Sequence, residues 1–160
     1  MLGRIFPRQF DNVFRGNQIA LWLFVPIIVL KMVIGVNSII MTRSVATSAD
    51  GIPLDTYSAA AADAVVALFA LLGLFQLFLA FFGFVALIRY RAMIPFLYLV
   101  LLLQMLGNRV LNYLHPIAQS GAAGTPAGFY LSLGILTATV LGFGLSLLNG
   151  SKSPDTTQQG

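Results

Sequence analysis

The chain has 160 residues, of which 58% are hydrophobic and only 9% are charged, and its mean hydropathy is +0.89. Soluble domains carry roughly a quarter charged residues, so this composition excludes a soluble globular domain, a disordered chain and a collagen-like fibre, and predicts an integral membrane protein. In such a protein the net charge of +4 indicates orientation and contact with anionic membrane lipids rather than with nucleic acid.

The first 17 residues contain a short amphipathic pattern. Over residues 5–16 four apolar side chains recur at helical spacing, with polar ones on much of the opposite side: Phe6, Phe10, Val13 and Phe14 against Arg8, Asp11, Asn12 and Arg15. Pro7 suits the first turn of a helix, and Gly16 followed by Asn17 suits its end. The pattern predicts an amphipathic helix in the membrane interface. The alternative is a partly ordered tail.

Four apolar runs follow, at about 18–41, 64–88, 92–114 and 128–148, each near the ~20 residues that span the hydrocarbon of a bilayer. The first run exceeds the roughly 7–15 apolar residues of a secretory signal, which favours an uncleaved signal anchor. The predicted fold is an all-α integral membrane protein, a four-transmembrane-helix bundle over residues 18–150 with an N-terminal interfacial amphipathic helix in residues 1–17. The polar residues 151–160 predict a disordered tail.

Basic residues flank these runs unevenly. Arg43 falls on one side of the membrane, and six cations fall on the other: Arg4, Arg8, Arg15, Arg89, Arg91 and Lys152. The positive-inside rule then predicts that both termini are cytoplasmic, in the inner membrane of a bacterium. In the loop after the first run, Asp55 or Thr56 is predicted to cap an early start of the second helix, which would then protrude from the membrane.

Lys31 lies near the middle of the first run, about 20 Å from Asn17 and about 18 Å from Arg43 at 1.5 Å per residue. A cation at that depth costs at least ~2.5 kcal/mol on insertion scales. Gln76 and Gln104 lie at similar depth in the second and third runs, so a cluster with Lys31 is predicted. One interpretation is a binding site for an anionic or carbonyl-bearing group. The other is a structural lysine that snorkels or bonds the neighbouring amides.

The third run carries a polar stripe. Its members are spaced 4, 4 and 3 residues apart and fall within an arc of about 80° on a helix: Gln104, Asn108, Asn112 and His115. The stripe could line a polar half-cavity that opens on the outer side, in which Asn108 and Asn112 join Lys31, Gln76 and Gln104 in one ligand-binding site. It could instead form amide hydrogen bonds between helices. Arg109 lies beside the stripe, and an ion pair with Asp63 at the outer end of the second run is predicted.

The fourth run has small residues at strict four-residue spacing: Gly134, Ala138, Gly142 and Ser146. Such a face is moderately specific for close helix packing, since small side chains let two backbones approach. The partner helix could be internal or come from another chain.

The composition also limits the chemistry. The chain has no cysteine and no glutamate, and it has a single histidine, His115. Disulfides, thiolate sites and bis-histidine haem ligation are therefore excluded, and no metal site or catalytic residue is predicted.

Three classes of function remain. The first is a non-enzymatic scaffold or accessory subunit that packs against partner helices through the small-residue face, with other membrane subunits or further copies of the chain as partners. The second is a carrier or binder of a lipophilic molecule (a quinone, lipid or pigment) through the polar cluster around Lys31. The third is an integral membrane enzyme that uses Asp63, His115 or Lys31.

Overall fold

The computed structural model describes residues 2–6, 11–115 and 127–148, and these residues form helices joined by turns, without a strand. The long helices are α2 (Gln18–Ile40), α4 (Ala59–Arg89), α5 (Ile94–Leu114) and α6 (Ala127–Leu147). The short helix α1 (Leu2–Ile5) precedes α2. Between α2 and α4 lie the short helix α3 (Thr42–Ser44), the π-helical turn η1 (Val45–Ala49) and the 3-10 turn η2 (Leu54–Thr56), and the 3-10 turn η3 (Arg91–Met93) joins α4 to α5.

Four helices are long and apolar enough to cross a membrane: Gln18–Ile40, Ala59–Arg89, Arg91–Leu114 and Gly128–Leu147. Their bounds lie close to the predicted runs, which confirms the all-α class and the number of candidate spans. Helix α4 differs most, because it begins before the predicted start at residue 64. Its cap is Ser58, whose hydroxyl oxygen accepts from the Ala61 N–H at 3.3 Å, whereas the predicted cap residues lie upstream in η2.

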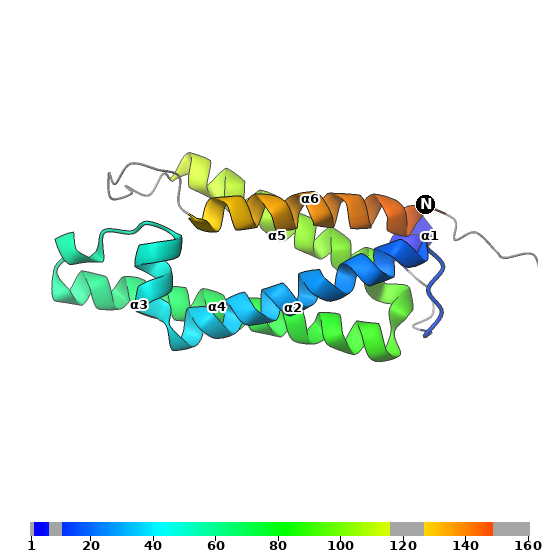
Figure 1. The fold of residues 1–160 in the computed structure, drawn as a ribbon, viewed down its shortest axis with the longest axis horizontal. Helices are drawn as coiled ribbons and strands as arrows, with labels where there is room; N and C mark the ends of the chain where they lie inside the picture. The colour runs from blue at the N-terminus through cyan, green and yellow to red at the C-terminus, as the bar shows by residue number, and fades with distance from the viewer. Residues whose placement is uncertain (1, 7–10, 116–126, 149–160) are drawn as a thin grey trace, which may run out of the picture.

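The long helices lie as two neighbouring pairs, α2 with α4 and α5 with α6 (Figure 1). Helix α2 also packs along α6, so the order of contact across the bundle is α4, α2, α6 and α5. We call the end with the start of α2, the α4–α5 hairpin and the end of α6 the terminal end. The opposite end, with α3, η1 and η2, is the loop end.

The N-terminal segment does not form the predicted helix over residues 5–16. Helix α1 is confined to Leu2–Ile5, and the described residues 11–17 have no helical turn. Residues 7–10 of that prediction, and the predicted disordered tail at 151–160, lie outside the described residues.

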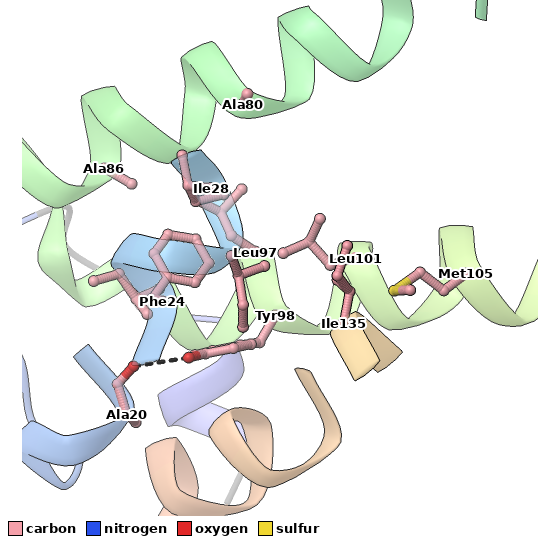
Figure 2. Packing of buried hydrophobic residues seen from close by; sticks show 12 residues of the cluster. Ala20, Phe24, Ile28, Ala80, Ala86, Leu97, Tyr98, Leu101, Met105 and Ile135 are labelled. Atoms are coloured by element: carbon pink, nitrogen blue, oxygen red, sulfur yellow. Dashed lines mark hydrogen bonds between the residues drawn. The ribbon is translucent and has the colours of Figure 1, made fainter. Parts of the chain in front are cut away.

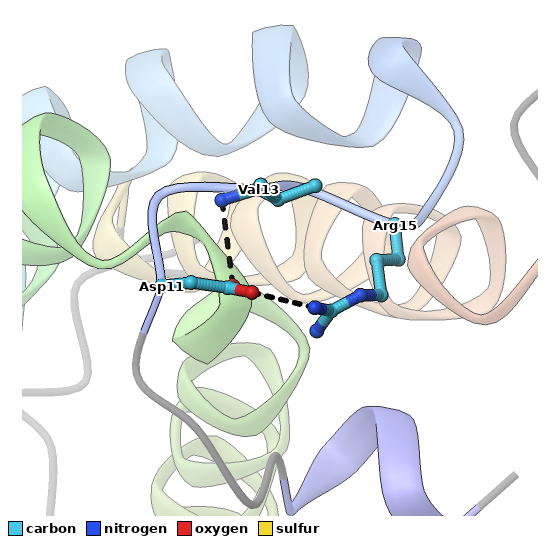
Figure 3. A network of polar contacts seen from close by, with 3 residues as sticks. All are labelled: Asp11, Val13 and Arg15. Carbon is cyan, nitrogen blue, oxygen red and sulfur yellow. Dashed lines mark hydrogen bonds and ion pairs between the residues drawn. The ribbon is translucent and has the colours of Figure 1, made fainter.

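Asp11 explains why the segment leaves the helical path. Its carboxylate accepts a hydrogen bond from the Val13 N–H at 3.4 Å and pairs with the guanidinium of Arg15 (Figure 3). Local bonds of this kind offer the backbone an alternative to helical hydrogen bonds. The segment docks on the bundle through main-chain bonds from the Ala92 N–H to the Asp11 carbonyl and from the Asn17 N–H to the Leu145 carbonyl, both at 3.3 Å.

The main core lies in the terminal half of the bundle (Figure 2). Phe24 of α2 and Tyr98 of α5 are fully buried there, with ring centroids 4.9 Å apart in an edge-to-face arrangement. The Tyr98 hydroxyl donates to the carbonyl oxygen of Ala20 at 2.7 Å, so the polar tip of this buried ring has a partner. These contacts join α2 to α5 where the two helices start.

Helices α2 and α4 cross closely at two glycines. A Cβ atom added to Gly35 would lie 3.0 Å from the carbonyl oxygen of Gly73, and one added to Gly73 would lie 2.7 Å from the Cβ of Ser38. Only glycine therefore allows this separation of the two backbones. The crossing places Lys31, one turn before Gly35, against α4.

A second, smaller core lies at the loop end. It consists of Ala46, Ile52, Leu54 and Ala62, and partly buried side chains from the first turns of α4 pack against it. At 1.5 Å per residue the 31 residues of α4 measure about 46 Å, more than the ~30 Å hydrocarbon core of a bilayer. Helix α4 is thus longer than a membrane span requires, and the small core packs on its first turns.

Candidate functional site

The structure brings together the three residues predicted to meet at the centre of the bundle. Lys31 of α2 is buried, with 6% of its surface exposed. Its Nζ donates to Oε1 of Gln76 in α4 at 3.4 Å and to Oε1 of Gln104 in α5 at 3.2 Å. Three helices therefore contribute one side chain each to a polar cluster, which we call the Lys31 cluster.

The Lys31 ammonium has no acidic partner in the part of the chain that the structure describes. The ion pairs found there are Arg15 with Asp11 and Arg43 with Asp63, and both lie at exposed positions. Among the described residues Lys31 is bonded only to neutral amide oxygens, so no negative charge there balances an ammonium at this position.

The cluster has hydrogen-bond donors left to offer. An ammonium has three N–H groups, and among the described residues two of them are used in the bonds to Gln76 and Gln104. Each of these glutamines turns its oxygen toward Lys31, which leaves its amide NH2 group as the free end. A further group that binds here can therefore use these donors by supplying hydrogen-bond acceptors.

The face of α5 that carries Gln104 is buried at the terminal end and exposed at the loop end. Leu97 and Leu101 on this face are buried, Gln104 is half-buried, and Asn108 and Asn112 are exposed. The two asparagines were predicted in the same site as Lys31. The structure instead places them beyond the Lys31 cluster, along an exposed row that begins at Gln104.

Helix α4 shows the same change along the face that meets the main core. At seven-residue spacing, Ala86 is 2% exposed, Leu79 is partly buried against the core, and Leu72 is 56% exposed. Residues seven apart lie within about 20° of each other on a helix. Beyond the Lys31 cluster the row on α5 stays exposed and polar. The row on α4 is apolar; it is exposed at Leu72 and covered again at Val65 by the second core.

The predicted ion pair between Asp63 and Arg109 is not formed. Asp63 accepts from Arg43 at 3.3 Å, because the short α3 brings Arg43 back to the first turns of α4. Arg109 is half-buried and lies against α6, where its guanidinium carbon is 5.4 Å from the centroid of the Phe129 ring and Nη2 donates to the Ser132 hydroxyl at 3.3 Å. The cation–π contact and the hydroxyl take the place of the predicted carboxylate.

The small-residue face of α6 packs mainly inside this chain. Gly142 and Ser146 are buried, Ala138 packs partly against the main core, and Gly134 is exposed with no atom within 4 Å of an added Cβ. At Gly142 an added Cβ would collide with the Tyr98 ring. Tyr98 is the important residue that the pattern of the sequence did not single out, since a hydroxyl in an apolar run signals a buried partner without saying which one.

The described residues outside the Lys31 cluster show no comparable group of polar side chains. Among the described residues no group of three or more histidine and carboxylate side chains comes together. His115 is exposed at the end of α5. The cavity at the terminal end, next to Phe14 and Pro95, holds about 20 Å³, which is room for a single water molecule.

Comparisons with known proteins give no match: no family model, no curated protein and no solved structure is significantly similar to the chain.

Proposed function

We propose that this protein spans the membrane four times and binds a lipophilic molecule whose head group accepts hydrogen bonds from the Lys31 cluster. The observation that carries the proposal is the buried, unbalanced ammonium of Lys31, held by two amide oxygens from two other helices. It supports a binder of a quinone, lipid or pigment as the best of the three classes.

The energetics of a buried cation favour a ligand. An unpaired cation at mid-membrane costs at least ~2.5 kcal/mol, and hydrogen bonds between helices in a membrane return about 0.6 kcal/mol each on average. The two bonds from Gln76 and Gln104 therefore recover less than the cost of burying Lys31. An acceptor on a bound molecule would add to this stabilisation.

The proposed orientation in the membrane has both termini in the cytoplasm of a bacterium, with the chain in the inner membrane. It is supported by the exposed Arg15, Arg89 and Arg91 at the terminal end and by Arg43 at the loop end.

Extraction of the purified protein tests the proposal. The wild-type protein, isolated in mild detergent and extracted with organic solvent, should release one enriched lipophilic species by mass spectrometry. Lys31→Met should lose that species. Asn37→Ala is the matched control, because Asn37 lies on the same helix with an exposed side chain, and it should keep the species. No enrichment in the wild-type protein over bulk lipid would reject the proposal.

A scaffold or accessory subunit is the second candidate, and one observation favours it. The loop-end half of α5 exposes apolar side chains on several sides, among them Leu103, Leu106 and Val110, and Gly134 on α6 remains open to a neighbour. Against it, the rest of the small-residue face is already occupied within the chain. A stoichiometric protein partner after mild extraction, without an enriched lipid, would support this candidate. The enzyme class has no comparable support, since no hydrogen bond or ion pair among the described residues joins any two of Asp63, His115 and Lys31.

A further inference from the structure

We propose that the ligand is a single-chain lipid with a terminal carboxylate, of the long-chain fatty acid class. Its head group would bind the Lys31 cluster, and its chain would lie in the exposed part of the inward rows of α4 and α5. This inference rests on the proposed binding function and adds the chemical class of the ligand and its position.

The charge of the cluster points to a monoanion. With Lys31 as an ammonium, the cluster carries one positive charge that no described residue balances, and it has N–H donors left to offer. A carboxylate carries one negative charge and only acceptors, so it matches both properties. A quinone carbonyl would satisfy the donors but leave the charge of Lys31 unbalanced, whereas a carboxylate would form an ion pair with it.

The depth of Lys31 limits the size of the head group. Lys31 lies about 20 Å from the start of α2 and about 14 Å from its end, below the interface where the phosphate of a phospholipid sits. With 6% of Lys31 exposed, only a small group can reach it. A carboxylate is close in size to the amide of Gln104, which is half-buried at the edge of the covered region. Rotation of that one flexible side chain would exchange an amide oxygen for a carboxylate oxygen.

The two exposed rows suit the two parts of such a molecule. The α5 row presents Asn108 and Asn112, whose amide groups can donate to a carboxylate as it approaches from the loop end. The α4 row presents Leu72, on the same face as Leu79, for contact with the hydrocarbon chain. An amphiphile is the class of ligand that uses a polar and an apolar row at once.

The test compares a fluorescent polyene fatty acid with its methyl ester on delipidated full-length protein in nanodiscs. The ester keeps the chain and loses the negative charge. We expect the acid to bind wild type at least tenfold more tightly than the ester, and Lys31→Met to reduce this ratio to about one. Asn37→Ala should keep the tenfold ratio.

A second pair of variants tests the position of the chain without touching Lys31. Leu72→Trp should weaken binding of both acid and ester, because the larger ring fills the α4 row. Leu71→Trp changes a neighbouring exposed residue that points about 100° away and should bind normally. Both positions are exposed, so both variants should fold.

The possible outcomes separate this inference from the proposed function. Equal binding of acid and ester to wild type overturns the carboxylate class, while the proposed function stands. Weaker binding of the acid than of a quinone probe in the same assay also overturns the carboxylate class and leaves the proposed function in place. If neither probe binds and no lipophilic species co-extracts with the protein, the inference and the proposed function fail together.

Discussion

The hydroxyl of Tyr98 lies over Gly142, and it donates from there to the main chain of α2. One aromatic ring thereby connects three helices: it starts on α5, crosses α6 where that helix has no side chain, and ends on α2. The absence of a side chain at one position of α6 is thus a condition for the contact between the other two helices.

Replacing Gly142 with leucine should be strongly destabilising, because the new side chain would occupy the volume of the Tyr98 ring. Overpacking of this kind costs about 1–3 kcal/mol, occasionally more. Gly144→Leu is the control, since Gly144 is exposed and an added Cβ there meets no atom within 4 Å. Thermal unfolding in detergent should show a large fall in Tm for the first variant alone. Equal Tm values would contradict the packing of Tyr98 on α6.

Tyr98→Phe should lower stability by about 0.5–1.5 kcal/mol, the usual net value of one hydrogen bond, because the ring remains and only the bond to Ala20 is lost. Tyr113→Phe removes a hydroxyl from a side chain that is 87% exposed and should leave stability unchanged. Chemical or thermal unfolding of the two variants side by side measures the difference. A loss as large for Tyr113→Phe would mean that the Tyr98 bond has no special role.

The ion pair at the loop end should join Asp63 to Arg43 and not to Arg109. Both members of the observed pair are exposed, so its coupling energy should be small, about 0.2–1 kcal/mol. A double-mutant cycle of Asp63→Asn with Arg43→Gln should give this value and decrease with added salt. The same cycle with Arg109→Gln should give a value near zero. Coupling confined to Arg109 would restore the pair predicted from the sequence.

Converting the whole Lys31 cluster to apolar residues should not unfold the protein. In Lys31→Met with Gln76→Leu and Gln104→Leu, the buried charge and its acceptors disappear together. Replacement of buried charged networks by apolar side chains is often neutral or stabilising by about 1–4 kcal/mol. We expect the triple variant to keep or exceed the wild-type Tm in delipidated form while it loses the ligand. A large fall in Tm would identify the cluster as a structural element.

The long helices and the Lys31 cluster could be predicted from the sequence because each depends on local information. Apolar runs near 20 residues define the spans, and depth along a helix follows from counting residues. Lys31, Gln76 and Gln104 lie at matching depths along their helices, so three polar side chains that face inward are expected to lie close together at the centre of the bundle.

The failed predictions depend on contacts between distant segments. Arg43 and Arg109 both lie at a depth in the bundle that would allow an ion pair with Asp63. The short helix α3, which leaves no periodic pattern in the sequence, brings Arg43 to Asp63. Residues 5–16 do have apolar side chains at helical spacing. The hydrogen bonds of Asp11 and the main-chain bonds between this segment and the bundle nevertheless hold the described part of it in a non-helical conformation. A small-residue stripe likewise does not reveal that its partner is the ring of Tyr98.

The unequal packing of the two halves of the bundle also predicts unequal local stability. Buried contacts concentrate in the terminal half, whereas the loop-end half of α5 is exposed on most sides, and segments with few buried contacts open at the lowest free energy. Amide exchange should therefore be fastest in the turns of α5 after Asn108 and slowest around Tyr98. Transient fraying of these turns of α5 would let a molecule reach Gln104, at the inner end of the exposed polar row, while the main core around Tyr98 stays closed.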